Sequence, residues 1–103
     1  MKIYLSGPNP AEQGFDFFKF EEAEISLKKL GHQVINPAKM DNGKITYDWL
    51  YYILRNLHHL QLCGVVYMLE DWDLSLNAQI EYAVAKCLDL YVLEVECQET
   101  SDN

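Results

Sequence analysis

The sequence predicts an α/β domain in which helices cover both faces of a parallel sheet of about four strands, a three-layer arrangement. Four short and almost continuously apolar runs alternate with three longer segments of helical periodicity, as expected for buried parallel strands joined by right-handed crossover helices. A chain of 103 residues can form one hydrophobic core but is too short for a second. We therefore expect one domain over residues 1–97 and a polar tail, QETSDN, over residues 98–103.

The first half of the chain is typical of a strand, a helix and a second strand. The first strand is expected at residues 2–6, KIYLS, because a Gly-Pro pair follows it directly. The helix is expected between residues 15 and 30, since acidic side chains lie early, lysines lie late and Gly31 follows as a stop. Its apolar stripe comprises Phe20, Ala23, Leu27 and Leu30. The second strand is expected at residues 32–36, HQVIN, and ends at Pro37.

The second half repeats this alternation after a long polar loop at residues 37–45. A helix is expected within residues 46–62, with an apolar stripe of Leu50, Ile53, Leu54, Leu57 and Leu60. The third strand is expected at residues 65–69, VVYML, and the fourth at residues 90–95, LYVLEV. The helix between them has an apolar side formed by Leu76, Ile80, Ala83, Val84, Cys87 and Leu88.

Charge and hydropathy argue against two classes of partner. Eight Lys plus Arg stand against sixteen Asp plus Glu, so no basic stripe exists to bind polymeric nucleic acid. No apolar run approaches the roughly 20 residues that span a bilayer, and the N-terminus reads as a strand instead of a signal peptide. We therefore expect a cytoplasmic protein without a membrane partner, in which Cys63, Cys87 and Cys97 are reduced and mostly buried.

Candidate binding residues follow the first and third predicted strands. In open α/β sheets a ligand binds beyond the carboxyl ends of the strands, where the first strand places Ser6, Gly7 and Pro8. The loop has neither of the glycine patterns that bind dinucleotides or nucleoside triphosphates. Ser75 or Asn77 is the expected N-cap of the third helix, whose first turn could bind a phosphate. The alternative is that Ser75 only caps its helix.

No metal or other cofactor is expected. His58 and His59 are adjacent, so on a helix they point about 100° apart and cannot share a metal ion. The acidic residues Glu70, Asp71 and Asp73 could hold Mg²⁺, although a solvated loop is the simpler interpretation.

Aromatic side chains near the second predicted helix suggest a subunit interface. These residues are Tyr47, Trp49, Tyr51 and Tyr52. They could stack on a base, but an aromatic helix face more often belongs to a core or to an interface between subunits. We therefore expect a homodimer.

Four segments together resemble a known family. They are YLSGP at residues 4–8, NPA at 36–38, RNLHHLQLCGVVYML at 55–69 and WDLSLNAQIEYAVA at 72–85. In this order and spacing they are similar to the DUF4406 family of the nucleoside 2-deoxyribosyltransferase-like superfamily. The resemblance spans about residues 1–95 and implies a flavodoxin-like, Rossmann-like fold. It also implies a small-molecule partner, a nucleoside or nucleotide.

The resemblance assigns roles to particular side chains. It implies that Glu81 attacks the anomeric carbon of a 2-deoxynucleoside or its 5'-monophosphate, releases the base and forms a glycosyl-enzyme ester. A carboxylate suits this chemistry because the transition state resembles a positive oxocarbenium ion. Tyr4 and Gly7 match the pocket wall beneath the sugar, and Ser75 matches a phosphate contact. The remaining candidates for substrate binding are Ser6, Pro8, Trp72 and Asn77.

Departures from the family pattern leave three functions open. Asn56 stands where the family has a catalytic Asp, and an amide cannot exchange the proton that a general acid or base would. The family's Asp before the third strand is Gly64, and two of its glycines are Asn77 and Asp89. The chain is therefore an N-glycosidase or deoxyribosyltransferase, a nucleotide binder impaired in catalysis, or an interaction module.

Overall fold

A four-stranded parallel sheet forms the centre of the protein, as predicted. The computed structural model describes residues 1–40 and 48–95. The strands are β1 (Lys2–Ser6), β2 (Gln33–Ile35), β3 (Val65–Met68) and β4 (Tyr91–Glu94), in the order β2-β1-β3-β4. The helices are α1 (Phe17–Lys29), α2 (Trp49–Leu60) and α3 (Leu76–Cys87), with short 3₁₀ helices η1 (Pro37–Lys39) and η2 (Trp72–Leu74). The strands and helices expected from the sequence are thus all present, with bounds shifted by a few residues.

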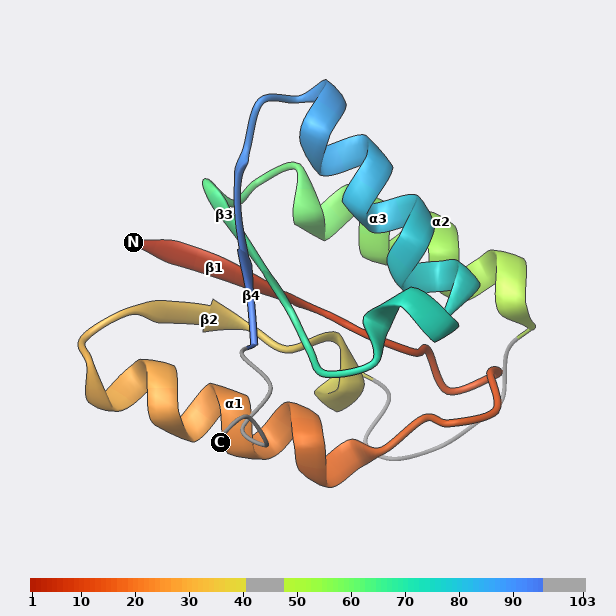
Figure 1. The fold of residues 1–103 in the computed structure, drawn as a ribbon, viewed down its shortest axis with the longest axis horizontal. Coiled ribbons are helices and arrows are strands. Elements are labelled where there is room, and N and C mark those ends of the chain that lie inside the picture. The colour runs from red at the N-terminus through yellow and green to blue at the C-terminus, as the bar shows by residue number, and fades with distance from the viewer. Residues whose placement is uncertain (41–47, 96–103) are drawn as a thin grey trace, which may run out of the picture.

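Helices cover both faces of the sheet, which confirms the three-layer arrangement. Figure 1 shows α1 on one face and α2 and α3 together on the other. Because side chains alternate along a strand, Ile3 and Leu5 of β1 pack on the α1 side, whereas Tyr4 packs on the side of α2 and α3. Ser6 lies on the same side as Tyr4, at the carboxyl end of the strand that pairs with both β2 and β3. The central strand therefore presents two polar side chains to α3.

Helix α1 lies within the predicted range of residues 15–30 and spans Phe17–Lys29. The Asp16 carboxylate accepts hydrogen bonds from two backbone N–H groups of the first turn, and Gly31 follows the helix with a φ of 93°. Phe20 and Leu27 of the predicted stripe are buried. Leu30 was expected in the same stripe, but it is the C-cap residue and is exposed. The reason is that the helix ends one residue earlier, so Leu30 leaves the face that packs on the sheet.

A buried carboxylate fastens α1 to the segment after β2. The Glu24 side chain accepts a hydrogen bond from Asn36 Nδ2 at 3.0 Å and forms ion pairs with Lys28 Nζ at 2.7 Å and Lys39 Nζ at 3.0 Å. Burial alone would raise the pKa of Glu24, but these three partners lower it to about 2. The paired and hydrogen-bonded carboxylate can therefore stay ionised although it is buried.

The buried face of α2 agrees in part with the predicted stripe, and that of α3 does not. On α2, Ile53 and Leu60 of the stripe are buried together with Tyr52 and Asn56, whereas Leu50 and Leu54 are exposed. On α3 the predicted apolar side is wrong, since Leu76 and Leu88 are exposed and the buried residues are Asn77, Ala78, Glu81 and Ala85. The alanines are small enough to let α3 approach the sheet closely, and hydrogen bonds compensate the buried polar groups. Glu81 consequently points at the sheet.

Several expectations concern cysteines, segments and membrane contact. Cys63 is buried as expected, but Cys87 is exposed because it lies at the end of α3, away from the sheet. Cys97, Tyr47, most of the expected loop at 37–45 and the tail at 98–103 lie outside the described residues. Within residues 1–40 and 48–95, no helix is both long and apolar enough to cross a membrane.

Candidate functional site

Glu81 lies at the centre of a hydrogen-bonded cluster at the carboxyl end of β1. Its side chain is fully buried. Tyr4 Oη donates a hydrogen bond to Glu81 Oε2 at 2.7 Å, and Ser6 Oγ donates to Oε1 at 2.6 Å. Both donors come from the same face of β1, two residues apart, so the strand geometry alone places them side by side. Glu81 is thus held by two neighbours and does not project into water.

The environment of Glu81 favours its neutral form. Burial raises the pKa of Glu81, hydrogen bonds from Ser6, Tyr4 and Asn77 lower it, and the charge of Glu12 raises it, with a resulting pKa of about 7. The pKa of the buried Tyr4 hydroxyl is raised well above its ordinary value, first by burial and then by Glu81, so this group remains a hydrogen-bond donor. A carboxyl group with a pKa near 7 can exchange between acid and carboxylate at neutral pH, as catalytic carboxyl groups often do.

Asn77 joins α3 to the loop that follows β1. Its amide donates a hydrogen bond to the Gly7 carbonyl at 2.8 Å and accepts one from Asn9 Nδ2 at 3.3 Å. A Cβ atom at Gly7 would lie 3.0 Å from the Phe20 ring and 3.1 Å from Leu69, so a larger residue here would force these side chains to shift. The loop therefore passes close against the sheet and packs beside the Glu81 cluster.

Glu12 is the site residue that sequence reasoning missed. Its carboxylate accepts hydrogen bonds from Ser75 Oγ at 2.6 Å, the Asn77 backbone N–H at 2.9 Å, the Asn9 backbone N–H at 3.2 Å and Trp49 Nε1 at 2.7 Å. Ser75 is also the N-cap of α3, since its Oγ accepts a hydrogen bond from the Ala78 N–H. The sequence left open whether the first turn of α3 binds a phosphate or Ser75 only caps the helix; Ser75 does cap it, and an acid of the same chain accepts hydrogen bonds from this turn. No pattern in the sequence signals this contact, because it joins residues 63 and 65 positions apart.

Asn56 is buried close to the loop after β1, but its partner is not Glu81. Its Oδ1 accepts hydrogen bonds from Arg55 Nε at 3.2 Å and Arg55 Nη2 at 3.0 Å. Arg55 Nη2 also donates to the Pro37 carbonyl at 3.3 Å. Asn56 lies on the buried face of α2. Together with Gly7 and Pro8 it lines a cavity of only about 10 Å³, too small for a nucleoside.

The ring contact and the hydrogen bond of Trp72 join it to residues other than Tyr4, Ser6 and Glu81. Its ring stacks on Tyr82 with centroids 4.8 Å apart, and its indole N–H donates to Glu94 Oε1 at 3.2 Å. These contacts direct Trp72 toward β4. The structure thus joins Tyr4, Ser6 and Asn77 to Glu81, and Asn77 in turn contacts Gly7 and shares Glu12 with Ser75.

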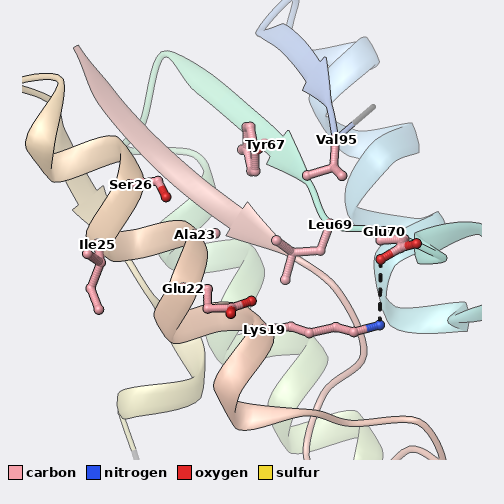
Figure 2. A pocket seen from close by; sticks show the side chains of 9 residues that line it. All are labelled: Lys19, Glu22, Ala23, Ile25, Ser26, Tyr67, Leu69, Glu70 and Val95. Carbon is pink, nitrogen blue, oxygen red and sulfur yellow. Dashed lines mark ion pairs between the residues drawn. The ribbon is translucent and has the colours of Figure 1, made fainter. Parts of the chain in front are cut away.

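The larger cavities of the described residues do not contain Glu81. One of about 550 Å³ lies beside α1 and the ends of β3 and β4 (Figure 2). Lys19 and Glu70 line it and approach each other to 3.9 Å. Another, of about 440 Å³, reaches Pro8 and Gly14 of the loop after β1. The larger cavities therefore lie away from the buried carboxyl group of Glu81. We identify the candidate site by this carboxyl group and its hydrogen-bond donors.

Comparison with known proteins extends the likeness from residues to the whole fold. The structure is similar to that of a 2-deoxyribosyltransferase from the psychrotolerant bacterium Bacillus psychrosaccharolyticus, which was characterised as a biocatalyst for the synthesis of nucleosides. The TM-score is 0.72 at 19% sequence identity, and the match covers 100% of this chain and 77% of that one. This likeness establishes the flavodoxin-like α/β fold. No curated protein matches the sequence. The model of a domain of unknown function, DUF4406, matches residues 1–94, and the chain belongs to that family.

Proposed function

We propose that the protein binds a 2-deoxynucleoside or its 5'-monophosphate and cleaves or transfers its N-glycosidic bond through Glu81. The observation that carries this proposal is the fully buried Glu81 carboxyl group, held by Tyr4 and Ser6 at the carboxyl end of the central strand. Ligands of open parallel sheets bind at that end. The fold shared with a 2-deoxyribosyltransferase supports the substrate class.

The proposed reaction needs a single carboxylate to form and break one bond to the sugar. Glu81 attacks the anomeric carbon, the bond from that carbon to the base nitrogen breaks, and the electron pair leaves with the base, which takes up a proton from water. Water then hydrolyses the glycosyl ester, or a second base accepts the sugar. In this scheme the Tyr4 and Ser6 hydroxyl groups orient the carboxylate and stabilise its ionised form, since they donate to different oxygens.

The substrate can reach Glu81 only after neighbouring residues move. Glu81 has no exposed surface, and both of its oxygens already accept hydrogen bonds. The loop over residues 7–16 packs beside it through Gly7, Asn9 and Glu12. We propose that the start of this loop, at Gly7 and Pro8, moves aside when substrate enters, while Glu12 keeps its contacts with the first turn of α3.

A second candidate function is nucleotide binding without efficient catalysis, and Asn56 favours it. The buried amide is fixed by the Arg55 guanidinium and has no proton to exchange. A missing general acid or base lowers a rate by roughly 10²- to 10⁴-fold. Binding of a nucleotide at this site therefore does not imply that the nucleotide is cleaved efficiently.

Release of free base by four proteins distinguishes the two candidates. Wild type, Asn56→Asp, Glu81→Gln and the double variant are incubated with each common 2-deoxynucleoside and its monophosphate, and the base is quantified by chromatography. We expect Asn56→Asp to raise the rate by about 10²-fold, the lower end for a general acid or base, because Arg55 would hold the new carboxylate ionised, so that it can take a proton from the water that hydrolyses the glycosyl ester. Glu81→Gln should abolish release in both backgrounds. Thermal stabilisation by substrate without base release, in folded variants, would favour the binder.

We also propose that the protein forms a homodimer through α2. Leu50, Tyr51 and Leu54 are 56%, 41% and 62% exposed and lie along one side of this helix. Apolar and aromatic side chains are enriched in subunit interfaces. Light scattering at micromolar concentration should give the mass of two chains, and the mass of one chain would refute this proposal.

A further inference from the structure

The first turn of α3 is already occupied by an anion that belongs to the chain. A helix N-terminus with a free Ser hydroxyl and free N–H groups attracts phosphates and carboxylates. Here Glu12 Oε1 accepts hydrogen bonds from Ser75 Oγ and the Asn9 N–H, and Oε2 accepts from the Asn77 N–H and Trp49 Nε1. Two donors serve each oxygen, and all four donors are neutral. The carboxylate is therefore well satisfied by hydrogen bonds but its charge is not cancelled by them.

Local structure holds Glu12 in this position. The Glu12 backbone N–H donates to the Asn9 carbonyl at 2.9 Å, and the Asn9 side chain accepts a hydrogen bond from the Ala11 N–H at 2.9 Å. The Phe15 N–H donates to the Glu12 carbonyl at 3.3 Å. Glu12 thus sits in a folded turn, and moving its carboxylate away would break its contacts with the Asn9 N–H, with Trp49 and with the first turn of α3.

We propose that Glu12 makes the site selective for substrates without a 5'-phosphate, so that neutral 2-deoxynucleosides are preferred over their monophosphates. This inference rests on the proposed function. A phosphate carries a charge of about −1.5 to −2 at pH 7 and seeks the same donors that Glu12 holds. It would meet a fixed like charge there, with Glu81 close enough to be influenced by Glu12 as well. A neutral sugar hydroxyl meets no such repulsion.

The opposite arrangement is that phosphate displaces Glu12 and takes over its donors. That exchange would leave the Glu12 charge to find water and would disrupt the turn at residues 9–12. We therefore favour exclusion, and displacement becomes an outcome that refutes the proposal.

The test compares affinities for matched neutral and phosphorylated ligands. Titration calorimetry measures binding of the four common 2-deoxynucleosides and of their 5'-monophosphates to wild type, Glu12→Gln and Glu12→Ala. Glu12→Gln keeps the shape of the side chain and removes its charge. Glu22→Gln is the control, because it removes an equal charge from an exposed position on α1.

Wild type should bind at least one deoxynucleoside about 10-fold or more tightly than its monophosphate. Glu12→Gln should reduce this ratio at least about fivefold by improving monophosphate binding, Glu12→Ala should reduce it further, and Glu22→Gln should not change it. Equal or tighter monophosphate binding by wild type would overturn the inference and leave the proposed function intact. Binding of neither ligand class would overturn both. The wild-type ratio stands as a test even if both Glu12 variants fold poorly.

Discussion

Replacing Glu81 by glutamine should stabilise the folded protein at neutral and alkaline pH, although it removes the proposed nucleophile. A glutamine has nearly the same shape and can keep contacts with the Tyr4 and Ser6 hydroxyl groups. It carries no charge, so it avoids the cost of burying an ionised group. The protein is expected to retain its fold in this variant, because Glu81 is surrounded by groups that can both donate and accept.

The size of this effect follows from the pKa of Glu81. The pKa is about 7 in the folded protein against an ordinary value of 4.5, so the folded state binds more protons than the unfolded state between these values. Wild-type stability is therefore unaffected by this group below about pH 4.5 and falls as pH rises through 7. At roughly 1.4 kcal/mol per pKa unit, the loss approaches about 3 kcal/mol by pH 8 and is below about 1 kcal/mol at pH 5. Glu81→Gln escapes that loss.

Urea unfolding of both proteins at pH 5 and pH 8 measures the difference. The stability of Glu81→Gln relative to wild type should increase by about 2 to 3 kcal/mol between the two pH values, with unchanged m-values. Any constant packing cost of the substitution cancels in this comparison. A relative stability that is the same at pH 5 and pH 8 would refute the reasoning, because it would mean that Glu81 ionises as readily in the folded protein as in the unfolded chain.

Two further predictions concern the carboxyl groups of the site and of α1. Base release by wild type should increase with pH through about 7, since attack needs the ionised Glu81. In the wild type the Tyr4 hydrogen bond lowers the pKa of Glu81, so its loss in Tyr4→Phe should raise this pKa and move the pH profile of base release to higher pH. The same pH profile in both proteins would contradict this prediction. Glu24→Gln should destabilise the protein by about 1 to 3 kcal/mol at pH 7 in urea unfolding, because Lys28, Lys39 and Asn36 lose a charged partner. Since the pKa of Glu24 is lowered to about 2, the wild-type advantage is present above about pH 4.5 and should shrink as pH falls toward 2, and an unchanged difference at pH 2.5 would rule out this ion-pair account.

The order of strands and helices was predictable, whereas the buried face of α2 was predicted only in part and that of α3 was not. Short apolar runs ended by Gly7-Pro8 and Pro37 mark strands because few other structures give that pattern. On α3, counting apolar residues selects Leu76 and Leu88, which the structure exposes. The buried face is instead set by close approach of Ala78 and Ala85 to the sheet and by hydrogen bonds of polar residues. Periodicity measures hydropathy and does not register either effect.

The candidate site was likewise predictable from the sequence only in part. Tyr4 and Ser6 could be placed together because they alternate onto one face of a strand, and their position at the strand end points to a ligand site. The role of Glu81 was inferred from the family resemblance. Glu12 could not be found, because its contacts with Ser75 and Asn77 depend on the path of a loop that has no regular period. Glu12, which we infer to set the substrate specificity, therefore lies in a loop, where sequence periodicity predicts little about contacts.

A covalent sugar on Glu81 is the most direct test of the account. Wild type and Asn56→Asp are mixed with a 2-deoxynucleoside, quenched in acid within milliseconds to seconds, digested and examined by mass spectrometry. We predict a deoxyribosyl ester on the peptide that contains Glu81, formed together with free base and absent from Glu81→Gln. Two results would contradict the central role of Glu81. One is base release that forms no adduct and continues in Glu81→Gln, and the other is an adduct on another residue.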